Sequence, residues 1–159
     1  MEVTIPFKTH FACTDNKVKA NRYMKANGQI LYNQSLSRFA RNYFMTNMHD
    51  YIMDYLEGYK VSDFPIEIKL TIYLIRNYQS VRRLKGEIRF PPNIDLEPNY
   101  DLDNIALIWR KAILDSLTLA GVIPDDNVNY IRKITDEIKF VSNPLEMKIN
   151  LKTEKYEES

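Results

Sequence analysis

The sequence predicts one α/β (α+β) domain, in which a small mixed β-sheet packs against a long helix and a second, shorter helix. Residues 65–75 alternate apolar and polar side chains, as in a half-buried strand. Residues 35–56 and 103–120 repeat apolar side chains every three or four positions, as in amphipathic helices. A chain of 159 residues that is 45% apolar suits one core. We expect a single domain over residues 1–152 and a frayed tail over 153–159.

The amino-terminal third is predicted to combine a strand, a turn and the long helix. Residues 2–7 form a short β-branched run that contains a proline, which indicates an edge strand. The pair Asn27-Gly28 lies between two partly apolar runs and predicts a hairpin that carries the neighbouring basic residues. The long helix is expected to begin at Ser35 and to stop at Gly58.

The second half is predicted to contain a long loop, the shorter helix and the remaining strands. Residues 77–100 sustain neither period, although a short strand fits 86–90, and a loop of this length is usually functional or mobile. Asp103 or Asn104 would cap the shorter helix, and Gly121 would close it. Beyond this helix we expect a turn over 122–127 and strands over 131–140 and 145–151.

Composition excludes several classes of protein. Cys13 is the single cysteine, so the chain has no internal disulfide, and with two histidines beside it a four-ligand zinc site cannot be built. We interpret Cys13, His10 and His49 as structural residues. No run approaches the ~18 apolar residues that a bilayer span needs, and the sequence opens without a secretion signal. We therefore expect a cytoplasmic protein without a membrane partner.

Charge is unevenly distributed, although the net charge is +1. Residues 8–41 hold seven basic residues against one acid, a second basic cluster lies within 82–89, and acids gather at 95–103 and 125–126. The pattern fits an enzyme that grips phosphates with cations and holds a divalent metal with carboxylates. It fits solvated loops equally well. The basic residues are Lys8, Lys17, Lys19, Arg22, Lys25, Arg38 and Arg41, and then Arg82, Arg83, Lys85 and Arg89.

An Asp-x-Asp run precedes the shorter helix, and a second acidic pair follows it. In extended backbone, Asp101 and Asp103 would point to the same side and could share one cation. Asp126 comes after a helix about 25 Å long, so it reaches them only if the chain doubles back. The structural alternative makes Asp103 a helix cap and Asp125 a turn residue.

These motifs follow one another in a fixed order: Asp101-Leu102-Asp103-Asn104, then Lys111, then Ile113-Leu114-Asp115-Ser116-Leu117, and then Ala120-Gly121-Val122-Ile123 before Asp125-Asp126. Together with Asn21-Arg22-Tyr23, they resemble the RusA family of Holliday-junction resolvases, which are crossover junction endodeoxyribonucleases. The resemblance implies a homodimer that binds a four-way DNA junction and cuts paired strands in recombination or repair. It implies Mg²⁺, with Mn²⁺ as a substitute, held by Asp101, Asp103 and Asp126. It also implies Lys111 as the catalytic lysine and no small-molecule cofactor.

The chain departs from the family pattern in two places. The lysine usually follows the second aspartate by four residues, whereas Lys111 follows Asp103 by eight, about one helical turn further on. Arg110 or another cation could serve instead, and Asp115 is expected to pair with Lys111. Polar residues also replace the basic stretch that often precedes the first aspartate. We therefore assign the DNA contacts to a basic arm consisting of Lys17, Lys19, Arg22 and Lys25.

Two other functional classes stay open. A non-catalytic branched-DNA-binding protein of a phage or mobile element would use the basic arm alone. Asp-x-Asp runs also hold Mg²⁺ or Mn²⁺ in haloacid-dehalogenase-type phosphatases and sugar-nucleotide glycosyltransferases. The phosphatase run would end a buried apolar strand, whereas polar Asn99 and Tyr100 precede Asp101 here.

Overall fold

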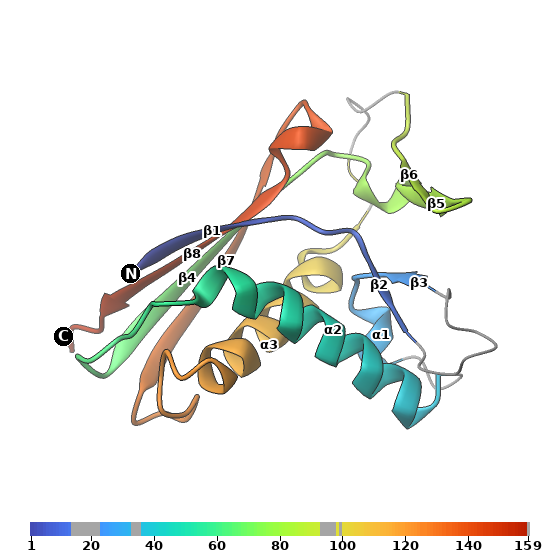
Figure 1. Cartoon of the computed structure of the whole chain (residues 1–159). Helices are drawn as coiled ribbons and strands as arrows, with labels where there is room; N and C mark the ends of the chain where they lie inside the picture. Colours follow the sequence, from blue (N-terminus) through green and yellow to red (C-terminus); the bar gives the residue numbers. More distant parts are fainter. Residues whose placement is uncertain (14–22, 33–35, 93–97, 99, 159) are drawn as a thin grey trace.

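The α+β architecture predicted from the sequence is present in the computed structural model, which describes residues 1–13, 23–32, 36–92, 98 and 100–158. A four-stranded sheet packs against two long helices, and two short β-ribbons stand outside the sheet (Figure 1). Among the described residues, no helix has the length and apolar character needed to cross a membrane.

The sheet is mixed, and its strand order is β1-β8-β4-β7. β4 (Ile66–Leu74) runs antiparallel to β8 (Lys148–Lys155) and parallel to β7 (Ile131–Phe140). β1 (Glu2–Pro6) pairs with β8 at the edge of the sheet, which confirms the predicted edge strand. Parallel neighbours need a crossover connection, and the connection between β4 and β7 contains α3 (Leu102–Leu119).

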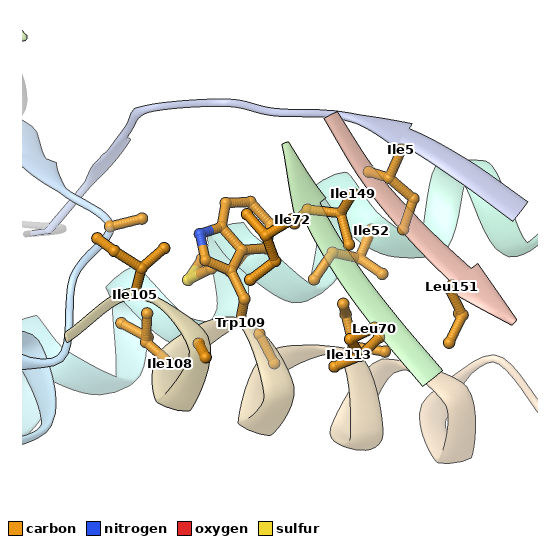
Figure 2. Packing of buried hydrophobic residues seen from close by; sticks show 14 of the residues in the cluster. Ile5, Ile52, Leu70, Ile72, Ile105, Ile108, Trp109, Ile113, Ile149 and Leu151 are labelled. Atoms are coloured by element: carbon orange, nitrogen blue, oxygen red, sulfur yellow. The ribbon is translucent and has the colours of Figure 1, made fainter. Parts of the chain in front are cut away.

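The two long helices supply a large part of the core beneath the sheet. α2 (Arg38–Leu56) packs against α3, and Ser37 caps it by accepting a hydrogen bond at 3.1 Å from the backbone three residues on. The helix therefore starts slightly after the predicted Ser35. Figure 2 shows Trp109 of α3 reaching toward the strand that carries Leu70, and this indole is fully buried.

The remaining elements are short. Lys85 and Gly86, which join β5 to β6, both have positive φ angles, 50° and 81°, the pattern of a type I′ hairpin turn. The elements are β2 (His10–Ala12) paired with β3 (Tyr23–Lys25), β5 (Arg82–Leu84) paired with β6 (Glu87–Arg89), α1 (Gln29–Tyr32), and the single 3₁₀ turns η2 (Tyr78–Ser80) and η3 (Pro144–Glu146).

The hairpin predicted at Asn27-Gly28 is wrong. The pair leads into α1 instead, and the Gly28 N–H donates a hydrogen bond to the carbonyl of Asn104 in α3. A Cβ at this glycine would lie 3.4 Å from the Asn104 Cα. The glycine thus serves the close approach of two backbones rather than a positive φ.

The predicted frayed tail begins too early. Thr153 lies in β8, where it pairs with Ile68 and is buried. The neighbouring charges face solvent, and Glu154 pairs there with Lys69 at 3.2 Å and Lys152 at 3.0 Å. The outer face of β8 is charged, so the end of this strand has the same polar sequence as a frayed tail. This explains why the tail was predicted to begin at residue 153.

Candidate functional site

Asp101 and Asp103 lie at the amino end of α3, and both are exposed. Asp101 is the N-cap residue, yet its carboxylate makes no capping hydrogen bond. Asp103 lies in the first helical turn, so the two residues do not share one extended segment, and Asp103 is not the cap. Both carboxylates therefore face solvent at the positive end of the helix dipole, where negative charge is stabilised.

The topology brings this end of α3 beside the carboxyl end of β4. The Tyr100 hydroxyl donates a hydrogen bond at 3.4 Å to the carbonyl of Ile75, one residue beyond β4. Burial raises the pKa of Tyr100 to about 12, so the hydroxyl stays protonated and able to donate. In open α/β sheets, ligands bind outside the carboxyl ends of parallel strands, and Asp101 lies at that position.

Lys25 also lies beside the amino end of α3. With Tyr100 and Asn104 it lines a hollow of about 160 Å³. Its Nζ donates to the carbonyls of Tyr78 at 3.3 Å and Gln79 at 2.7 Å. Burial, and next the nearby Arg82 charge, lower the pKa of Lys25 to about 8. Sequence reasoning assigned Lys25 to a DNA-binding arm, but in the structure it is partly buried at this site.

Asp126 and Lys111 meet at a different hollow, of about 190 Å³, halfway along α3. Both residues are exposed, and Asp115 also lines the hollow. Asp125 is a turn residue, because its carboxylate accepts hydrogen bonds at 2.8 Å from the Asp126 N–H and the Asn127 amide. These two hydrogen bonds, the backbone one first, lower the pKa of Asp125.

Two ion pairs determine which cation of α3 is available. Arg110 pairs with Asp136 of β7, whose side chain is 6% exposed, so Arg110 fastens the helix to the sheet. Lys111 pairs with Asp115 at 3.5 Å, as predicted, and its side chain is 53% exposed. His49 of α2 lies 3.3 Å from the same carboxylate, a contact for which the sequence gives no motif. Lys111 is therefore the more accessible of the two cations considered for catalysis.

The structure does not bring the three motif aspartates together. Asp101 and Asp103 lie at the amino end of α3, whereas Asp126 reaches the helix near Lys111, about 12 Å further along its axis at 1.5 Å per residue. Within the described ranges, no group of three or more Asp, Glu, His or Cys side chains is placed to hold a metal ion. The chain does double back after α3, but it stops short of the first two aspartates.

The remaining predicted residues are the basic arm and the residues interpreted as structural. Lys17, Lys19 and Arg22 of the basic arm fall outside the described residues. His10 and Cys13 are buried, as expected of structural residues. The Nδ1 of His10 lies 2.8 Å from the Thr9 hydroxyl, and burial, with the Lys25 and Arg83 charges after it, lowers the pKa of His10 to about 4.

The sequence matches no protein-family model and gives no significant match to a curated protein. The resemblance to the RusA resolvases therefore depends on the motif residues themselves, most of which lie between 101 and 126.

Proposed function

We propose that the chain is a Mg²⁺-dependent endodeoxyribonuclease that resolves four-way DNA junctions. One observation carries the proposal: Asp101, Asp103 and Lys111 are exposed on α3, and Asp126, in the turn that follows this helix, is exposed at the same hollow as Lys111. Phosphodiester hydrolysis needs carboxylates for a metal and fixed positive charge for the phosphate.

The fit of a metal differs between the three aspartates. A set containing Asp126 does not fit one ion, because Asp126 lies with Lys111 rather than with the other two. Asp101 and Asp103 match in number and kind what proteins commonly provide to Mg²⁺, which takes its other ligands from water and substrate phosphates. Mn²⁺ would suit the same oxygen atoms. A bound ion would supply charge neutralisation at the phosphate and an activated water.

The protein residues have separate tasks in this proposal. Asp101 and Asp103 hold positive charge at the carboxyl end of β4, and Lys25 adds a cation at the same end of α3. Lys111, held by Asp115, contacts a phosphate further along the strand path, and Asp126 lines the same hollow as that lysine. A phosphate-contacting cation away from the metal raises affinity and positions the duplex.

The decisive experiment uses a labelled synthetic four-way junction incubated with the protein, in Mg²⁺ or in EDTA. We expect paired cleavage in Mg²⁺, and Asp103→Asn should lower the rate about 100-fold or more while junction binding is kept. Asp125→Asn is the matched control, because that carboxylate is engaged within its own turn. Binding without any Mg²⁺-dependent cleavage would refute the nuclease.

The second candidate is a non-catalytic branched-DNA-binding protein. It is favoured by the absence, in the described part of the chain, of three metal-ligating side chains in one place. The Asp-x-Asp enzymes acting on phosphate monoesters or sugar nucleotides are disfavoured, because Asp101 occupies the N-cap position of a helix and the nearest described strand before it ends at Arg89. The junction experiment separates both from the nuclease.

Paired cleavage also requires two sites, and we propose a two-fold homodimer. Most of the apolar stripe of α2 is buried in the core, so it does not form the interface as a whole. Phe39 at the start of α2 is 78% exposed, and Leu119 at the end of α3 is also exposed. Large exposed apolar side chains of this kind mark candidate interfaces.

A further inference from the structure

A third hollow, larger than the two beside α3, is lined by residues of the β1–β2 connection, the β5–β6 hairpin and η3. Its volume is about 480 Å³, which lies within the roughly 300–1,000 Å³ of small-ligand pockets. None of the motif aspartates lines it. The hairpin that forms one wall belongs to residues 77–100, for which the sequence predicts a long loop that is functional or mobile.

The walls of this hollow are apolar and aromatic. Phe90 and Ile88 line it from the hairpin and remain 40% and 38% exposed. Tyr51 of α2 and Tyr23 of β3 supply further rings, and Met147 after η3 lies opposite. Exposed aromatic surface inside a concave site suits a flat, apolar ring system.

The charges of the lining are positive. Lys8 and Arg83 line the hollow, and none of the described residues that line it is an Asp or Glu. The Arg83 guanidinium lies 3.8 Å from the centroid of the Tyr23 ring, and the Lys8 Nζ lies 5.0 Å from that of Phe11. Stacking on rings fixes both cations in position, and Arg83 keeps its edge donors for an anion. His10, which also lines the hollow, is uncharged at neutral pH because its pKa is about 4.

We propose that this hollow binds one nucleotide, whose base lies against Phe90 and Ile88 and whose phosphate lies at Lys8 and Arg83. A flat ring joined to a phosphate is the ligand that an aromatic wall and two cations fit together. The proposal does not use the aspartates of α3, so it goes beyond the nuclease and stands or falls independently of it.

The surroundings favour a nucleotide within a single strand over a free one. The hairpin carries Arg82 and Lys85 outside the hollow, and both are exposed. A free nucleotide needs no charge beyond the hollow, whereas a strand carries phosphates at each neighbouring position. Aromatic stacking inside a positively charged groove is the usual way in which proteins bind single strands.

The hollow also adjoins the site on α3 through the β2–β3 ribbon. His10, which lines the hollow, is the register partner of Lys25, which lines the hollow at the amino end of α3. A strand whose unpaired nucleotide enters the large hollow would thus pass close to the end of α3.

The experiment measures binding of a fluorescent ten-nucleotide oligothymidylate by anisotropy, in EDTA, so that metal and cleavage play no part. We expect Phe90→Ala and Arg83→Gln each to weaken binding about tenfold, the effect of losing one stacked base or one charged contact. The matched controls are Leu84→Ala on the same hairpin and Lys133→Gln on β7, which lie outside the hollow and should change binding less than about threefold.

Location is tested by photo-crosslinking with an oligomer that contains 5-iodouracil. The proposal requires the crosslink to fall within residues 6–10, 83–90 or 144–147, or at Tyr23 or Tyr51. If thymidine monophosphate competes as well as the unlabelled oligomer does, the site binds free nucleotides, and the proposal that it binds a nucleotide within a single strand is overturned. Equal losses in the test and control variants, crosslinks elsewhere, or tighter binding of a polyglutamate peptide would overturn the nucleotide site itself. Cleavage of junctions by Phe90→Ala, or its absence, bears on the nuclease and not on this site.

Discussion

Removing Arg110 should destabilise the protein without removing its chemistry. The Asp136 side chain is 6% exposed and that of Arg110 is 34% exposed, and the two form an ion pair between α3 and β7. Deleting one partner of a fully buried pair costs about 3–5 kcal/mol, because it leaves an uncompensated charge. Water reaches the arginine here, so we expect Arg110→Met to cost about 2–3 kcal/mol. For a chain of 159 residues this corresponds to a fall in Tm of about 4–12 °C.

Urea unfolding followed by circular dichroism measures this cost, and two further variants make the interpretation specific. Arg110→Met/Asp136→Leu should cost less than Arg110→Met alone, because no buried charge is left unpaired. Lys111→Met should cost about 0.5 kcal/mol or less, since its pair with Asp115 is a solvent-exposed i, i+4 contact. Loss of junction cleavage in Arg110→Met at unchanged stability would refute the anchoring role and make Arg110 the catalytic cation.

Three further outcomes follow from the same structure. Because the unfolded chain binds a proton at His10 below pH 6.5 and the folded chain does so near pH 4, the free energy of unfolding should fall by about 2 kcal/mol as pH drops from 6.5 to 4. His10→Gln, compared with wild type by urea unfolding at each pH, should remove that part of the slope, and an unchanged slope would show that other groups cause it. Lys25→Met should slow junction cleavage about tenfold or more and Lys111→Met less, measured as single-turnover rates, and the reverse order would return Lys111 to the catalytic role. Sedimentation equilibrium should give twice 18.8 kDa for the wild type and a monomer for Phe39→Glu or Leu119→Glu, whereas a monomeric wild type alone and on the junction would exclude paired cleavage by a dimer.

The fold was predictable where one periodic pattern extends over many residues. The strand at 66–74 buries every second side chain, and the helix at 102–119 buries every third or fourth. Burial therefore determines both the type of each element and the face that it turns to the core. The errors occur where a short sequence motif is compatible with two different backbone structures. Asn27-Gly28 suits a tight turn, but the backbone of α3 uses the same glycine for a close contact. Lys85-Gly86 forms the type I′ turn instead, although lysine rarely adopts a positive φ.

The candidate site was only partly predictable, because spacing along a chain does not give distances across a fold. The exposure of Asp101, Asp103, Lys111 and Asp126 agrees with a functional role that the motif indicates. The separation of Asp126 from Asp101 and Asp103 depends on the length of α3. It also depends on how many residues follow the helix before Asp126, because these determine how far back along the helix Asp126 lies. The position of Lys25 depends on the pairing of β3 with β2, which no pattern in the sequence specifies.

The crossover between β4 and β7 accounts for this division physically. A helix that connects two parallel strands must begin at the carboxyl end of the first strand and end near the amino end of the second. Asp101 and Asp103 therefore share one edge of the sheet with the end of β4 and with Lys25, whereas Asp126 belongs to the return toward β7. Compared with the four-residue spacing of the RusA pattern, the eight residues from Asp103 to Lys111 place this lysine about 6 Å further from Asp103 along the helix. In this chain the cation at the amino end of α3 is consequently Lys25, which lines one hollow with Tyr100 and Asn104. Lys111 lies further along the helix, and in the proposed function it contacts a neighbouring phosphate.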